Sequence, residues 1–221
     1  MKKSKKAIIF GTNSFAEMVY YYLSNDSEYE VVAFTVSKAH INDDVKFGLP
    51  VVPFESVQGI YTPLDHEMYV AIAYVNMNKI RQRFYNEAKG KGYNLLTYIS
   101  SKASIYTEVI GDNCFIFEDN TLQPYIKLGN NIVLWSGNHI GHHSTIEDHC
   151  FIASHAVISG HCVIKENSFI GVNATIRDSV IIEKENIIGA GAVILKNTKE
   201  KEVYAVRNTE LFPKSSDQVN I

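Results

Sequence analysis

An aliphatic residue recurs at every sixth position through more than a third of this chain. From Ile110 to Ile194 every member of the series is isoleucine or leucine, and the run has no insertion. The members are Ile110, Ile116, Leu122, Leu128, Leu134, Ile140, Ile146, Ile152, Ile158, Ile164, Ile170, Ile176, Ile182, Ile188 and Ile194. A period of six matches neither an α-helix, at 3.6, nor a long strand, at 2. It predicts a chain that bends every six residues.

Three such segments would form a triangular coil of eighteen residues, and about five coils are expected. The aliphatic residue points inward, and the mostly small residue four positions later, such as Cys114 or Ala156, shares the interior. Repeats of this kind bury their apolar side only by stacking on one another. The residue three positions after the aliphatic one is often His, Asn or Gly, as at His143, His149 and His161. We interpret that column as a turn position that favours these residues for backbone reasons.

Residues 1–99 have a different pattern, with short apolar runs separated by amphipathic segments. We expect strands at 7–10, 30–36, 68–74 and 94–99, an extended segment at 48–54, and helices at 15–23 and 78–89. This alternation predicts a Rossmann-like α/β domain with a mainly parallel sheet. The chain therefore divides into an α/β domain at 1–99 and an all-β domain at 100–221, which ends in one strand near 203–206 and a polar tail.

The turn after the first strand is a candidate binding element. It contains Gly11 but lacks the two further glycines of a dinucleotide fingerprint, and Thr35 stands where an acidic ribose ligand would be expected, so NAD is not expected. The N–H groups at a helix N-terminus can still hold phosphates. We therefore consider Gly11, Asn13, Ser14 and Phe15 as substrate contacts, with a plain turn as the alternative.

Polar residues also follow the third expected strand, at the sheet edge where α/β proteins bind ligands. Tyr74, Asn76 and Arg81 are the candidates, together with Thr35 at the end of the second strand. An arginine in this place could contact a diphosphate, and it could equally be a solvated helix residue.

Composition excludes several classes of protein. The net charge of −3 and the pI of about 6.2 give no field that would attract nucleic acid. No apolar run predicts a signal peptide or a membrane span. The cysteines, Cys114, Cys150 and Cys162, all fall in the inward small column, which predicts core packing without disulfides and a cytoplasmic location.

The chain resembles the sialic acid O-acetyltransferase and bacillosamine-pathway N-acetyltransferase family. The resemblance rests on the α/β domain joined to an uninterrupted hexapeptide run, and on the segments 136–144, 158–161, 169–173 and 188–192. It implies a left-handed parallel β-helix, a homotrimer with active sites between subunits, acetyl-CoA as co-substrate and a nucleotide-linked sugar held by the N-terminal domain. It also places the catalytic histidine at His142 and the acetyl-CoA contacts at Gly160, Val172 and Ala190.

The coil register gives an independent interpretation of His142. It comes two residues after the inward Ile140, so its ring should face outward, and Gly160 one coil further on leaves room beside it. A neutral imidazole there can accept the proton of an attacking amine, and the Gly160 N–H can stabilise an oxyanion. No metal is required.

The partner that orients His142 is left open by the sequence. Relatives have an acidic residue directly after the histidine, and here that residue is His143. Asp178, two coils on, is expected to be too distant within one chain, while Glu147 and Asp148 would need a neighbouring subunit to present them.

Two further departures concern the sugar nucleotide. Phe15 replaces a histidine that contacts the phosphates in the bacillosamine enzymes, and Thr35 and Val36 replace acidic residues after the second strand. Asn138 lies in the inward small column, where it either satisfies coil backbone or reaches the sugar beside His142.

We therefore expect an acetyl-CoA-dependent N-acetyltransferase that acts on a UDP- or dTDP-linked amino-deoxy sugar in surface polysaccharide or glycan synthesis. A sugar O-acetyltransferase of the same fold is the close alternative. A zinc enzyme like the γ-class carbonic anhydrases, with His139, His142 and His143 as candidate ligands, is the alternative from another class, and a catalytically idle scaffold follows it.

Overall fold

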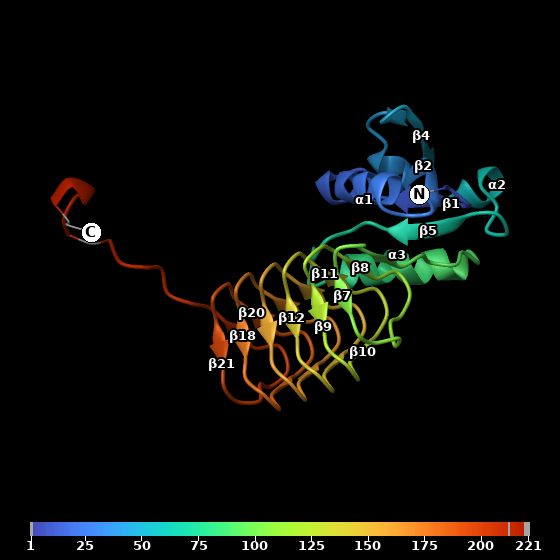
Figure 1. Cartoon of the computed structure of the whole chain (residues 1–221). Coiled ribbons are helices and arrows are strands. Elements are labelled where there is room, and N and C mark those ends of the chain that lie inside the picture. Colours follow the sequence, from blue (N-terminus) through green and yellow to red (C-terminus); the bar gives the residue numbers. More distant parts are fainter. Residues whose placement is uncertain (1, 212, 219–221) are drawn as a thin grey trace.

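The computed structural model describes residues 2–211 and 213–218, and Figure 1 shows an α/β domain beside a long stack of triangular coils. The N-terminal domain contains a five-stranded sheet in the order β3-β4-β2-β1-β5. β1 (Lys5–Phe10), β2 (Tyr29–Val36), β4 (Leu49–Pro53) and β5 (Glu67–Val70) are parallel, and β3 (Val45–Lys46) is antiparallel to β4. The mainly parallel sheet predicted from the sequence is thus present.

Two helices cover opposite faces of this sheet. Along β1, Ala7 and Ile9 pack in the cluster that contains α1 (Ser14–Asn25), whereas Ile8 and Phe10 pack in the cluster that contains α3 (Lys79–Gly90). This is the alternation of side chains that a strand imposes. The described residues also form three shorter helices: η1 (Lys38–His40), α2 (Val57–Ile60) and η2 (Ser216–Gln218).

The second domain is a parallel β-helix built from strands of two residues. Each strand pairs with the strand one coil away, such as Val133–Leu134 with Phe151–Ile152, and three sheets result, β10-β13-β16-β19, β22-β20-β17-β14-β11-β8-β6 and β21-β18-β15-β12-β9-β7. The strands are β6 (Tyr98–Ile99), β7 (Ser104–Ile105), β8 (Phe115–Ile116), β9 (Thr121–Leu122), β10 (Lys127–Leu128), β11 (Val133–Leu134), β12 (His139–Ile140), β13 (Thr145–Ile146), β14 (Phe151–Ile152), β15 (Val157–Ile158), β16 (Val163–Ile164), β17 (Phe169–Ile170), β18 (Thr175–Ile176), β19 (Ile181–Ile182), β20 (Ile187–Ile188), β21 (Val193–Ile194) and β22 (Val203–Tyr204).

The interior follows the six-residue period. Every aliphatic residue of the series is buried except Ile110, which is partly buried at the open end of the stack. The small column is buried as well, including the three cysteines. The β-helix core is therefore one continuous column of side chains.

The turn column adopts the left-handed backbone region throughout. Its members have φ between +51° and +77°: Asn113, Asp119, Tyr125, Asn131, Gly137, His143, His149, His155, His161, Asn167, Asn173, Ser179, Glu185 and Gly191. Asn and Gly adopt this conformation at low cost. The backbone interpretation of the column is confirmed.

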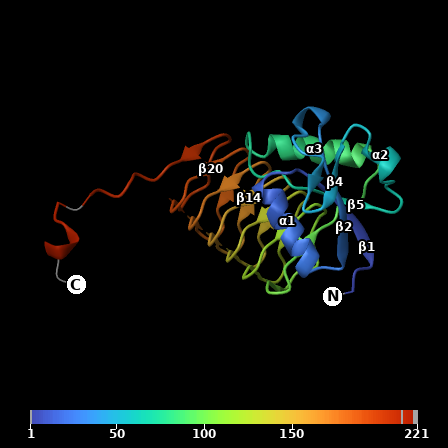
Figure 2. The same ribbon diagram turned by 90° about the horizontal axis from the view of Figure 1, so that it is seen from above.

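The two domains share an aromatic core. Phe15 and Tyr22 of α1 pack against Phe115, Phe117 and Trp135 from the β-helix face that contains β8 and β11, with ring centroids 5.0–6.5 Å apart. Figure 2, seen from above, shows α1 lying along this part of the stack. The N-terminal domain is thereby fixed to one of the three faces of the β-helix.

Three expected elements differ from the structure. The strand expected at 94–99 is divided, because Leu95 bridges to Met68 whereas Tyr98 and Ile99 already pair with the first coil. The strand expected at 68–74 ends at Val70, and the one near 203–206 is the short β22. Within the part of the chain that the structure describes, none of the helices combines the length and apolar character needed to cross a bilayer.

Candidate functional site

His142 lies in the turn between β12 and β13, on one edge of the triangular stack, and its side chain is exposed. The sequence prediction of an outward-facing ring is correct for this residue. Its backbone N–H donates to Oε1 of Gln123 one coil back, at 2.9 Å, which holds the turn in place.

Gly160 makes room for the imidazole. A Cβ atom at this position would lie 2.9 Å from Cε1 and 3.0 Å from Nε2 of His142, so any side chain here would collide with the ring. The same point is 3.0 Å from Oδ1 of Asp178. Asp178 therefore faces the imidazole across Gly160, but no hydrogen bond or ion pair joins the two side chains, in agreement with the expectation that Asp178 is too distant within one chain to orient the ring.

Three histidines meet at this edge. Nδ1 of His142 lies 3.1 Å from Nδ1 of His143, and one ring nitrogen from each of His142, His143 and His161 falls within a set whose atoms are all within 4.8 Å of one another. The His143 and His161 rings stack at 4.9 Å, and the His142 ring is nearly perpendicular to both. The sequence analysis grouped His142 and His143 with His139 as candidate zinc ligands, whereas the structure groups them with His161, which had been placed only in the turn column.

A hollow of about 390 Å³ opens at the carboxyl ends of β1, β2 and β5. Gly11 and Asn13 line it, as predicted, and so do Arg83, Ser37 and His40, which the sequence analysis did not select. Gly11 has φ of +122°, and a Cβ there would lie 2.8 Å from the Ala71 carbonyl oxygen, so the turn requires glycine. Asn13 caps α1 by accepting a hydrogen bond from the Ala16 N–H. We name this hollow the sheet-edge pocket.

A second hollow, of about 430 Å³, lies between α1 and the β-helix. It is lined by Ser14, Phe15, Met18, Ala73, Tyr74, Trp135, Phe151, Ala153, Ser154, Phe169 and Val172. The predicted substrate contacts Ser14, Phe15 and Tyr74 meet the predicted acetyl-CoA contact Val172 here. We name this hollow the interdomain pocket.

Arg81 is not available to a diphosphate. It is fully buried, and its guanidinium donates to the backbone carbonyls of Ala73, Asn131, His149 and Cys150 at 2.7–3.2 Å. Burial lowers the pKa of Arg81 to about 10, so it stays charged at neutral pH, and no carboxylate among the described residues pairs with it. Its role is to join α3 to the coils, and the predicted ligand role is corrected.

Two further predicted contacts are also buried. Thr35 has no exposed surface and donates to the Val52 carbonyl, and Asn138 is 1% exposed, with Oδ1 accepting from the Ala156 N–H at 2.8 Å. Of the two interpretations of Asn138, the asparagine that satisfies coil backbone is the correct one. Asn76 is exposed but lines neither pocket.

The predicted acetyl-CoA contacts divide between two edges of the stack. Val172 and Ala190 are exposed and lie one coil apart on the edge between the β14 and β15 faces, as shown by the Gly191 N–H donating to the Val172 carbonyl. Gly160 lies with His142 on the edge between the β12 and β13 faces. One chain therefore does not bring all these groups to a single place.

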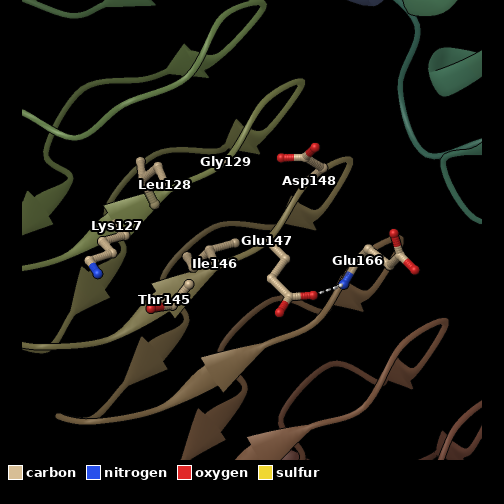
Figure 3. A pocket seen from close by; sticks show the side chains of 8 residues that line it. All are labelled: Lys127, Leu128, Gly129, Thr145, Ile146, Glu147, Asp148 and Glu166. Carbon is tan, nitrogen blue, oxygen red and sulfur yellow. Dashed lines mark hydrogen bonds between the residues drawn. The ribbon is translucent and has the colours of Figure 1, made fainter.

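The carboxylates Glu147 and Asp148 line a shallow acidic hollow of about 360 Å³ (Figure 3). Oε2 of Glu147 accepts from the Glu166 N–H at 3.3 Å, and Oδ1 of Asp148 accepts from the Asn130 N–H at 2.7 Å. Each of these two side chains thereby links neighbouring coils through a hydrogen bond. A contact of either with His142 of a neighbouring subunit stays a prediction.

The cysteines are free and buried, with no role in the site. Burial raises the pKa of the Cys114 and Cys150 thiols to about 12, so they are not reactive thiolates at neutral pH.

Comparison with known proteins bears on the repeat and the fold. The family model described as bacterial transferase hexapeptide (six repeats) matches residues 125–160 and 161–196. A sequence search of curated proteins finds no match. The repeat identified from the spacing alone is thus confirmed over the middle of the β-helix.

Three solved structures share the fold over most of the chain. The acetyltransferase domain of PglB from Neisseria gonorrhoeae has a TM-score of 0.80 at 20% identity and covers 90% of this chain and 96% of its own. A histidine variant of perosamine N-acetyltransferase from Caulobacter crescentus, in complex with CoA and GDP-perosamine, has a TM-score of 0.77 at 20% identity, with 90% and 92% covered. WeeI from Acinetobacter baumannii has a TM-score of 0.73 at 23% identity, with 92% and 95% covered.

These matches confirm the predicted fold class, a Rossmann-like α/β domain followed by a left-handed parallel β-helix. They also confirm the hexapeptide-repeat part of the resemblance made from the sequence and the fold that it implied.

Proposed function

We propose that this protein, which combines hexapeptide repeats with the fold of the sugar N-acetyltransferases, transfers the acetyl group of acetyl-CoA to the amino group of a nucleotide-linked amino-deoxy sugar. The observation that carries the proposal is the outward His142 ring over Gly160 on an edge of the β-helix. The perosamine enzyme of the same fold was solved with CoA and a nucleotide-linked sugar. The PglB domain was also solved with acetyl-CoA.

The geometry fits general base catalysis by His142. The contact between Nδ1 of His142 and Nδ1 of His143 needs one donor and one acceptor. When His142 donates, the lone pair of its Nε2 is free to accept the proton that the attacking amine loses. We assign His143 as the positioning residue that holds this tautomer, in the place where relatives have an acidic side chain. Asp178, on the far side of Gly160, stabilises the imidazolium that forms.

The sheet-edge pocket is the proposed nucleotide site. It lies outside the carboxyl ends of parallel strands, where α/β sheets bind ligands, and the N-terminus of α1 opens beside it. Arg83 replaces Arg81 as the proposed phosphate ligand, because its side chain is more than half exposed and lines the pocket. Gly11, Asn13, Ser14, Phe15 and Tyr74 remain proposed substrate contacts around the two pockets.

The active site is proposed to form between subunits of a homotrimer. The N-terminal domain covers the β-helix face that contains β11 and β14, whereas His142 lies on the edge opposite that face. A nucleotide held by one chain would reach His142 of a neighbour, and acetyl-CoA would lie between Gly160 of one chain and Val172 and Ala190 of the other. We place the enzyme in the cytoplasm, where acetyl-CoA is available and the free thiols stay reduced.

Replacement of His142 tests the catalytic role. We expect His142→Ala to lower turnover at least about a hundredfold with little change in CoA binding, because the base acts on the reacting proton. Thiol release with acetyl-CoA and a panel of UDP-, dTDP- and GDP-linked amino sugars measures turnover. His66→Asn, a histidine replacement before β5 that lies outside both named pockets, is the control and should behave as the wild type. Unchanged turnover in His142→Ala would contradict the assignment.

The same panel separates the alternatives. Acceptors that carry a hydroxyl in place of the amine identify an O-acetyltransferase. Activity as a carbon dioxide hydratase that requires stoichiometric zinc would replace the transferase proposal with the zinc enzyme.

A further inference from the structure

The cluster of His142, His143 and His161 has the features of a transition-metal site. We propose that it binds Zn²⁺ or a similar dication, and that the bound ion reversibly inhibits the enzyme by occupying the base. The proposed metal binding is argued from geometry alone, whereas the proposed inhibition by the metal rests on the proposed function. The ion is an inhibitor in this proposal and takes no part in acetyl transfer.

The backbone pre-arranges two of the ligands. His143 and His161 occupy the same turn one coil apart, with φ of +59° and +58°, and the His161 N–H donates to the His142 carbonyl at 2.9 Å. Tyr125 packs on the other side of the His143 ring, at 4.7 Å. Because the rings are already stacked, metal binding needs little further ordering of these side chains.

The third ligand approaches from the side. The His142 ring is nearly perpendicular to its two neighbours, with centroids 5.2 and 5.0 Å away, and the space over Gly160 lets it lie there. Its nitrogen is 3.1 Å from that of His143, and the three ligand atoms all lie within 4.8 Å. Ligand nitrogens around tetrahedral zinc, at 2.0–2.1 Å from the metal, are about 3.3 Å apart. Small rotations of the exposed histidine side chains would bring their nitrogens from within 4.8 Å to this spacing.

The donor set indicates the class of ion. Three imidazoles suit Zn²⁺, Ni²⁺, Co²⁺ and Cu²⁺, whereas Mg²⁺ and Ca²⁺ prefer oxygen ligands. The Asp178 carboxylate, next to the His142 ring across Gly160, adds negative charge that favours a dication. The fourth position stays open to water.

Coordination disables the base through either ring nitrogen. If Nε2 binds the ion, its lone pair is occupied. If Nδ1 binds the ion, the neutral ring must carry its proton on Nε2, which then cannot accept another. Added zinc should therefore lower turnover, and a chelator should restore it.

Titration of the chelator-treated full-length protein with CoCl₂ tests the site directly. We expect one cobalt ion per chain with the visible absorption of tetrahedral Co²⁺, displaced by ZnCl₂. His161→Asn keeps a residue that the left-handed turn accepts, as Asn131 and Asn167 show. It should retain basal turnover within about twofold while needing at least about tenfold more zinc for the same inhibition.

His155→Asn is the matched control, because it makes the same change in another turn of the stack and should leave cobalt binding and zinc inhibition unchanged. Equal cobalt binding by His161→Asn and the wild type would overturn the site, as would no binding by either. Faster turnover with zinc would overturn the inhibition. If no sugar is acetylated, the cobalt titration still decides the site, so failure of the proposed function is distinguishable.

Discussion

Gly160 controls the position of the His142 ring at the scale of single atoms. A methyl group there would approach Cε1 and Nε2 of the imidazole to about 3 Å, closer than real contacts allow, so the ring must move. Because small displacements of a catalytic group can cost about a hundredfold in rate, we expect Gly160→Ala to lower kcat at least about tenfold. The thermal midpoint should change little, since an exposed ring can rotate away.

Gly90→Ala is the matched control for this substitution. A Cβ at Gly90, the last residue of α3, would meet no heavy atom within 4 Å, so kcat should match the wild type and the thermal midpoint should be equal or slightly higher. If Gly160→Ala retained full kcat, the ring would not need its present position for the reaction.

The left-handed turn column makes a separate prediction about stability. Asn173 has φ of +56° and an exposed side chain. Asn173→Gly should leave the free energy of unfolding within about 0.5 kcal/mol of the wild type. Asn173→Val should lower it by about 1–2 kcal/mol, because a β-branched side chain opposes this backbone conformation. Denaturant unfolding of the two variants measures the difference, and equal values would contradict a backbone origin for the column.

The position of a side chain could be predicted from the sequence wherever the six-residue register determines its environment. Inward, turn and outward positions follow directly from the period, which is why the placement of His142 and the cysteines was predictable. The register does not specify that the missing side chain at Gly160 leaves Asp178 facing the His142 ring without a hydrogen bond to it. The meeting of His142 with His143 and His161 likewise depends on ring rotations that spacing does not specify.

The spacing of apolar residues in α3 could have predicted that Arg81 is buried. Arg81, Phe84, Tyr85 and Ala88 are its buried residues, at spacings of three, four and seven, so Arg81 belongs to the inward stripe of the helix. Its charge suggested a ligand contact, whereas the partners that make burial tolerable are backbone carbonyls of a domain fifty or more residues away. Those backbone carbonyls lie close to Arg81 only after the two domains have packed together, so the local sequence does not identify them.

The junction between α3 and the coils should depend strongly on Arg81. Arg81→Met leaves the carbonyls of Ala73, Asn131, His149 and Cys150 without this donor. We expect the free energy of unfolding to fall by at least about 3 kcal/mol, because several buried carbonyls lose a hydrogen-bond donor at a cost of about 1–3 kcal/mol each. Arg83→Met, two residues along the same helix and largely exposed, should change it by less than about 0.5 kcal/mol. Similar losses in both variants would show that Arg81 does not join the domains.

At the scale of the whole molecule, one chain holds two incomplete halves of the proposed site. The sheet-edge and interdomain pockets lie with the N-terminal domain on the face that contains β11 and β14, and His142 lies on the edge away from that face. A closed ring of identical chains brings the pocket of each subunit to the catalytic edge of the next through one repeated contact. The stoichiometry should therefore be three, with a mass of three times 24.9 kDa in solution.

Subunit complementation tests this arrangement in a way that mass alone cannot. His142→Ala removes the base but leaves the pocket, whereas Arg83→Glu leaves the base but places a negative charge where the phosphates are proposed to bind. Each variant alone should be nearly inactive at low sugar nucleotide. Random trimers formed by co-expressing equal amounts should regain up to about a quarter of wild-type activity, because a quarter of the sites then pair an intact base with an intact pocket from a neighbour. If each chain used its own base and pocket, no mixed trimer would contain an intact site, and activity would stay at the level of the separate variants.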